Sequence, residues 1–257
     1  MEPMLILEWL LFFLFLELSI FLLIKSKRNE RKIRMVGETG YIFLFIGYTF
    51  MWMFIIIADY YIASEFIRLI VLNIGFSIEV ILAFVFILLV ERKYIFVRKF
   101  FFSSIYFILF IIYIFILIFQ ISLGAFVSSL FWLLFIAFIS FYWKNLYRTY
   151  YVKIEVKKFQ SDIIKFSLGI ILVFIGYIFT TRFIVDQFSL IYRLIGDLLQ
   201  ILGSFLLFFF FGSISSLSEL FWKSEIDIIY IIHKSGLLIT QKSFQKEKDY
   251  VQKSIDS

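Results

Sequence analysis

The sequence predicts an all-α integral membrane protein: a bundle of seven transmembrane helices with the N-terminus outside and the C-terminus in the cytoplasm. Two observations lead to this fold class. The chain of 257 residues is 63% hydrophobic and 23% aromatic, whereas soluble domains are about half apolar. Its long apolar stretches also alternate with clusters of basic residues. An aqueous core cannot bury this much apolar surface, so we expect lipid to cover much of the protein.

Seven apolar stretches are long enough to cross a bilayer, which needs about 20 residues per helix. The predicted spans are 3–24, 40–58, 69–90, 101–119, 121–143, 166–185 and 190–214. The fourth and fifth spans are nearly continuous. Together they are too long for a single crossing of the bilayer, so we expect a hairpin near 120–124. The spans form a transmembrane domain over residues 1–216, and a cytoplasmic tail follows at 217–257.

The basic residues set the orientation. Of the 25 Lys and Arg residues, all except Arg68, Arg182 and Arg193 follow spans one, three, five or seven. Basic residues concentrate on the cytoplasmic side, so the pattern fits an odd number of crossings in the cell membrane. The net charge of +6 then reflects topology and contact with anionic lipid, and we expect no binding of nucleic acid. The start of the chain lacks a basic n-region, so we expect the first span to remain as a helix.

Spans two and six are similar. Residues 40–55 (GYIFLFIGYTFMWMFI) and 169–184 (GIILVFIGYIFTTRFI) share nine residues, and each stretch is followed by Arg-Leu-Ile, at Arg68 and Arg193. The match indicates a parallel three-plus-one-plus-three repeat with span four as a lipid-facing linker. Chance is the alternative, because Phe and Ile are abundant. Glycines seven residues apart lie on one helical face and permit close backbone approach, so we expect spans two, six and seven in the packed centre of the bundle.

Polar residues within the spans are costly and are therefore the candidates for function. The ligand-binding candidates are Glu79, Asp197, Gln200, Asn73, Arg193 and Glu17. In span seven, Arg193, Asp197 and Gln200 recur at three- and four-residue steps and form one polar stripe. Glu8 lies nearer the outer end, and we expect water around it.

Two interpretations of this stripe remain open. In the functional one, it faces Glu79 and lines a polar cavity that opens to the outside. In the structural one, Asp197 pairs with Arg193, one turn away, or with Arg182. Gln200 then bonds to a neighbouring helix and Glu79 to a serine.

The composition argues against an enzyme. The chain has no cysteine and one histidine, His233, which excludes disulfides and His/Cys metal clusters within one chain. Neither a phosphate-binding loop nor a dinucleotide-binding glycine motif occurs. Span seven lacks the lysine that a retinal protein would need. We therefore expect no metal, cofactor or catalytic residue.

The tail carries a hairpin pattern over residues 226–244. Residues 226–233 (IDIIYIIH) and 237–244 (LLITQKSF) are separated by the turn signal Lys-Ser-Gly. The pattern resembles the opening hairpin of longin- and roadblock-type domains. An isolated hairpin is marginal in water. The hairpin could therefore pair with a partner, lie against the membrane or begin a longer signalling protein; a partly ordered basic tail is the fourth alternative.

Two function classes fit this architecture. In topology alone, the chain resembles the seven-helix N-terminal sensor regions of prokaryotic histidine kinases, which implies a receptor that signals to a cytoplasmic partner through residues 226–257. The three-plus-one-plus-three plan is similar to that of SWEET and PQ-loop transporters, although the Pro-Gln dipeptide and the helix prolines are missing. We favour the sensor, with a small-solute or ion transporter as the alternative. A lipid-interacting scaffold and a homodimer remain open.

Overall fold

The computed structural model describes residues 2–28, 36–93, 98–150, 156–213, 228–232 and 238–243. The long helices are α1 (Glu2–Arg28), α2 (Val36–Ile56), α3 (Glu65–Lys93), α4 (Phe101–Phe119), α5 (Gly124–Tyr150), α6 (Val156–Thr180) and α8 (Leu190–Ser213). The short elements are the π-helix η1 (Ile57–Tyr61), the 3-10 helix η2 (Ile121–Leu123), the helix α7 (Arg182–Gln187) and the strands β1 (Ile228–Ile232) and β2 (Leu238–Ser243).

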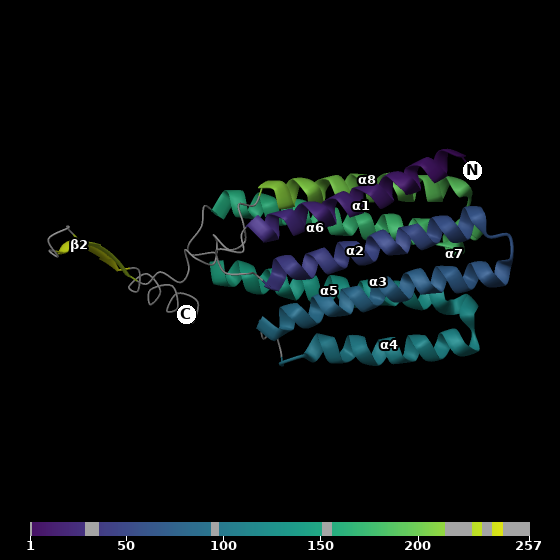
Figure 1. Ribbon diagram of the computed structural model, residues 1–257, viewed down its shortest axis with the longest axis horizontal. Helices are drawn as coiled ribbons and strands as arrows, with labels where there is room; N and C mark the ends of the chain where they lie inside the picture. The colour runs from purple at the N-terminus through teal and green to yellow at the C-terminus, as the bar shows by residue number, and fades with distance from the viewer. Residues whose placement is uncertain are drawn as a thin grey trace.

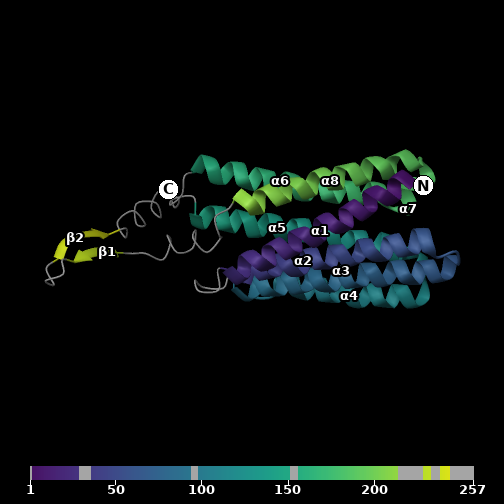
Figure 2. The same cartoon turned by 45° about the horizontal axis from the view of Figure 1, so that its top comes forward.

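The long helices lie side by side, and consecutive ones run in opposite directions (Figures 1 and 2). We call the end of the bundle that holds the chain's N-terminus the N-end. Helices α1, α3, α5 and α8 begin at the N-end, and α2, α4 and α6 end there. The turn expected near 120–124 is formed by η2, which joins α4 to α5.

Within the described ranges, six helices are long and apolar enough to cross a membrane. These segments are Met4–Lys27, Thr39–Tyr61, Glu65–Arg92, Phe101–Phe119, Ile121–Tyr142 and Leu190–Gly212. The apolar part of α6, Ile164–Thr180, is shorter. The chain is thus an all-helical bundle of membrane-protein character with six to seven apolar helices.

The predicted sixth span, 166–185, is not one helix. Helix α6 ends at Thr180, Thr181 has extended backbone with ψ 142°, and α7 starts at Arg182. The hydroxyls of Thr180 and Thr181 donate to the carbonyls of Tyr177 and Ile178, at 2.8 and 2.6 Å. Such hydroxyls offer the backbone partners outside the regular helical ladder, and the helix ends where two of them follow one another.

Glycines let α6 and α8 pack backbone against backbone. A Cβ placed on Gly176 would lie 2.5 Å from the carbonyl oxygen of Gly196, and one placed on Gly196 would lie 2.6 Å from that of Gly176. Gly169 of α6 and Gly203 of α8 make the same backbone contact about two helical turns away. Small residues permit such close approach in membranes, where burial of apolar surface drives association weakly.

The half of the bundle away from the N-end is filled with aromatic rings. Tyr41 contacts Phe86, Phe166 and Phe211 with ring centroids 4.8, 5.7 and 5.1 Å apart. All four rings are buried. Helix α4 packs through Phe102, Ser103, Tyr106 and Tyr113 and exposes most of its remaining apolar side chains, as expected for a lipid-facing helix.

The two strands lie within the predicted hairpin range 226–244 and pair antiparallel, with Tyr230 opposite Gln241. Residues 214–227, 233–237 and 244–257, which include His233 and most of the tail, lie outside the described residues.

Replacement of Gly196 by Ala should destabilise the bundle. The new Cβ would meet the Gly176 backbone, which cannot move aside as a side chain could, and overpacking of this kind costs about 2 kcal/mol. Thermal unfolding in detergent micelles measures the loss. Gly212→Ala is the matched control, because a Cβ there has nothing within 4 Å. Equal stability of the two variants would contradict close α6–α8 packing.

Candidate functional site

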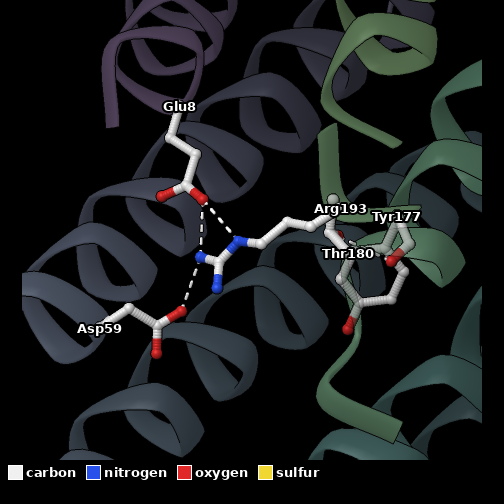
Figure 3. Close-up of polar contacts among 5 residues, drawn as sticks. All are labelled: Glu8, Asp59, Tyr177, Thr180 and Arg193. Atoms are coloured by element: carbon white, nitrogen blue, oxygen red, sulfur yellow. Dashed lines mark hydrogen bonds and ion pairs between the residues drawn. The ribbon is translucent and has the colours of Figure 1, made fainter. Parts of the chain in front are cut away.

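A buried ion network lies at the N-end. Arg193, in the first turn of α8, donates from Nε and Nη2 to Glu8 Oε1 of α1, at 2.8 and 2.6 Å. Its Nη2 also donates to Asp59 Oδ2 of η1, at 2.7 Å. Figure 3 shows the two carboxylates approaching the guanidinium from separate helices. Helices distant in sequence are thus joined by one side chain.

The network is largely shielded from solvent. The side chains of Glu8, Arg193 and Asp59 are 0%, 13% and 14% exposed. The guanidinium also lies 6.0 Å from the centroid of the Tyr60 ring, within the range of a cation–π contact. Its charge is therefore already compensated by two carboxylates and one aromatic ring.

The π-helical turn η1 presents Asp59. Helix α2 continues without a break into Ile57–Tyr61, where the wider turn precedes the extended residue Ile62. Single π-turns are rare and are frequent at functional sites. The turn follows the last residue of α2 and lies at the N-end of the bundle, where Asp59 reaches Arg193 of α8.

The predicted pairing of Asp197 with Arg193 is wrong. Helical side chains lean toward the start of their helix, so Arg193 points outward to Glu8 and Asp59 and away from Asp197. Asp197 is fully buried, and neither of its carboxylate oxygens has a hydrogen-bond partner among the described residues. It lies close enough to Glu8 and Arg193 for electrostatic interaction.

Gln200 lies farther along the same face of α8. Its Oε1 accepts a hydrogen bond from the Tyr48 hydroxyl of α2 at 2.7 Å, which is the bond to a neighbouring helix that the structural interpretation predicted. Its Nε2 is buried without a partner in the described part of the chain. The Gln200 backbone packs against Gly176.

Glu79 is buried in the middle of α3. It makes no hydrogen bond to a serine within the described residues, since the neighbouring Ser77 donates to the Asn73 carbonyl instead. Its carboxyl group interacts electrostatically with four buried tyrosines, Tyr48, Tyr106, Tyr113 and Tyr177. Tyr48 is also within electrostatic range of Asp197.

Asn73 and Glu17 lie outside this arrangement. Asn73 Nδ2 donates to the carbonyls of Leu69 and Ile121, at 2.8 and 3.1 Å, and so holds the α4–α5 turn against α3. A Cβ on Gly124 would overlap Asn73 Oδ1. Glu17 is exposed on α1. The structure therefore gives Asn73 a structural contact and brings Glu17 to none of the other candidates.

A cavity of about 50 Å³ lies beside the network. Its lining residues are Trp52, Ile55, Asp59, Leu72, Phe76, Tyr177, Thr180, Thr181 and Arg193. A second cavity, of about 20 Å³, is lined by apolar and aromatic residues around Tyr48 and Trp132. Neither cavity is lined by Glu79 or Asp197, so the cavity that those two were expected to share coincides with neither.

Sequence reasoning missed two members of the network, Glu8 and Asp59. Glu8 was expected to be wet, yet it is fully buried. The sequence contains a signal for this pairing. Arg193 cannot lose its charge and needs acidic partners, and Glu8 and Asp59 are acidic residues that lie at the same end of the bundle. No group of three metal-ligating side chains occurs in the part of the chain that the structure describes.

Comparison with known proteins does not assign a function. No family model matches the chain, and neither a curated protein nor a solved structure shows a significant match. The function therefore has to be argued from the geometry of the N-end.

Replacement of Arg193 by Gln should lower the free energy of unfolding by about 3 kcal/mol, because it leaves two buried carboxylates without their counter-charge. Denaturation by sodium dodecyl sulfate measures the change. Arg68→Gln is the control, since Arg68 pairs at 3.8 Å with a Glu65 side chain that is 77% exposed, and such pairs contribute about 0–1 kcal/mol. Equal losses would show that the network is not a stabilising element.

Proposed function

We propose that the chain is a seven-helix receptor of the cell membrane that receives a small ligand at the N-end and signals through its cytoplasmic tail. The single observation that carries this proposal is the buried Glu8–Arg193–Asp59 network beside a cavity. Ionic groups within a membrane protein commonly mark binding or transport sites. The N-end is then the outer end.

The seventh crossing is α6 together with α7. The 17-residue apolar helix Ile164–Thr180 is about 26 Å long, close to the roughly 30 Å of the hydrocarbon core. Helix α7 and the turn after it fill the remainder. An odd number of crossings also places nearly all Lys and Arg residues on the cytoplasmic side.

Cysteine labelling tests this topology without background, because the chain contains no cysteine. A membrane-impermeant maleimide applied to intact cells should label Ser64→Cys and Ser189→Cys, at the N-end, and should label Lys99→Cys only after permeabilisation. All three positions are exposed. Labelling of Ser64→Cys but not Ser189→Cys would mean that α6 does not cross, and the reverse pattern at Lys99 would invert the orientation.

A receptor is favoured over a channel-like path because packed aromatic rings close the cytoplasmic half of the bundle, whereas the polar face of α8 begins at the N-end. The polar side chains extend from Arg193 through Asp197 to Gln200 and Glu79, near the middle of their helices. Beyond them, the rings of Tyr41, Phe86, Phe166 and Phe211 close the cytoplasmic half. A ligand can reach the network from outside, while the signal must pass through helix movement.

Helix α8 is the element that can transmit the signal. It carries Arg193 in its first turn and leads to the tail. Helix α1 is tied to it at both ends: by Glu8 at the N-end and by Lys25, whose Nζ donates to the Phe211 carbonyl at 2.6 Å. A ligand that disturbs the outer tie would therefore change how α1 and α8 meet at the cytoplasmic end. A partner that binds residues 226–257 would register the change.

Breaking the outer tie should therefore move the inner ends of α1 and α8. Spin labels at Leu23 and Phe209, both exposed, report the distance between these inner ends by pulsed electron paramagnetic resonance. In Arg193→Gln we expect a shift of about 1–2 Å, the size of typical helix displacements in switching proteins. Arg68→Gln should leave the distance unchanged. An unchanged distance in Arg193→Gln would remove α8 as the transmitting element.

A transporter of three-plus-one-plus-three plan is the alternative, and one observation favours it. Gly40 and Gly47 of α2 pack on α3, and the matching Gly169 and Gly176 of α6 pack on α8. Equivalent contacts at equivalent positions are expected of a duplicated three-helix unit. Uptake of a solute by liposomes, abolished in Glu79→Gln or Asp197→Asn, would decide for the transporter.

A further inference from the structure

The cavity beside Arg193 has aromatic walls. Trp52 of α2, Phe76 of α3 and Tyr177 of α6 line it, and all three rings are buried and held by packing. The rings of Phe76 and Tyr177 are in edge-to-face contact, with centroids 6.3 Å apart. Aromatic faces carry partial negative charge and attract cations, most strongly where water is excluded.

The charges around the cavity also favour a cation. Two carboxylates, those of Glu8 and Asp59, share the guanidinium of Arg193, and Asp197 lies within electrostatic range of Glu8 and Arg193. Arg193 already pairs with two of them and contacts the Tyr60 ring. An anionic ligand would have to compete with two carboxylates for one guanidinium. A cationic ligand beside Asp59 would add positive charge where two carboxylates share one guanidinium.

The two threonine hydroxyls in the lining are left with acceptor lone pairs. Thr180 and Thr181 line the cavity, and the hydroxyl of each donates to a backbone carbonyl of α6. Only the oxygen lone pairs of these hydroxyls remain for a ligand. Asp59 adds carboxylate oxygens. The indole N–H of Trp52, which is buried and meets no acceptor at regular hydrogen-bond geometry in the described part of the chain, is a donor that would favour an acceptor ligand instead. Acceptors and aromatic rings together are the surroundings that an ammonium group requires.

We propose that this cavity binds a small organic cation of the alkylammonium class, held by Asp59, the two threonine hydroxyls and the aromatic walls. The volume of about 50 Å³ fits a group of few heavy atoms, since a water molecule occupies roughly 30 Å³. The inference rests on the proposed receptor function, because it names the ligand class of the same site.

Saturation-transfer NMR on the purified full chain in detergent micelles tests the ligand class, with methylammonium chloride as the probe. Its methyl resonance should show saturable transfer that equal concentrations of sodium chloride do not displace. Methanol, the neutral isostere, and sodium acetate, an anion of similar size, should show none. Transfer to acetate alone, displacement by sodium, or equal transfer to methanol would each overturn the proposal.

Three variants locate the site. Asp59→Asn should weaken methylammonium binding at least tenfold, whereas Glu65→Gln, which removes an exposed carboxylate at the same end, should leave it within twofold. Trp52→Phe keeps a ring and removes the indole N–H, so it should retain binding within about threefold. Weakening by Trp52→Phe equal to that by Asp59→Asn would indicate an acceptor ligand, and unchanged binding in Asp59→Asn would place the cation elsewhere.

Failure of this inference is distinguishable from failure of the receptor proposal. If methylammonium does not bind, but Arg193→Gln still moves the inner ends of α1 and α8, the ligand class is wrong and the receptor proposal stands. If methylammonium binds at Asp59, but that distance stays fixed, the site exists without the proposed signalling.

Discussion

The counter-charge demanded by Arg193 is the constraint around which the N-end is organised. A guanidinium stays charged in any protein environment, so a helix of this apolar bundle that carries it must find carboxylates nearby. They come from α1 and η1 and not from α8 itself. Three elements are thereby fixed at one point, and the π-turn that carries Asp59 belongs to this arrangement.

The close contact of α6 with α8 adds a second constraint. Gly176 meets Gly196 and Gly169 meets Gly203 with no side chain between the backbones, so neither helix can slide or rotate far without the other. Helix α6 also supplies Tyr177, Thr180 and Thr181 to the cavity. The cavity wall and the helix that leads to the tail are therefore in direct backbone contact, and in the proposed receptor this contact would couple a ligand in the cavity to α8.

Hydropathy was sufficient to predict the apolar helices and the turn after α4, because membrane thickness dictates helix length. Glycine spacing indicated which helices pack closely, and the bond of Gln200 to a neighbouring helix was among the alternatives considered. The network was not predicted, because the rotation of each helix about its axis decides which acids meet Arg193. The outward lean of Arg193 also separates it from Asp197, although their sequence spacing alone permits pairing.

Some buried polar groups are fully hydrogen-bonded and others are not, which argues against a role in helix packing alone. Asn73 is fully used in holding a turn, and Arg193 bonds two carboxylates. Asp197 and the Gln200 amide nitrogen have no partner in the described structure, although a buried polar group left unpaired costs about 1–3 kcal/mol. Helix adhesion selected for stability alone would have paired these groups or replaced them with apolar residues. Their presence on the face of α8 that begins with Arg193 supports the proposed site over a role in packing alone.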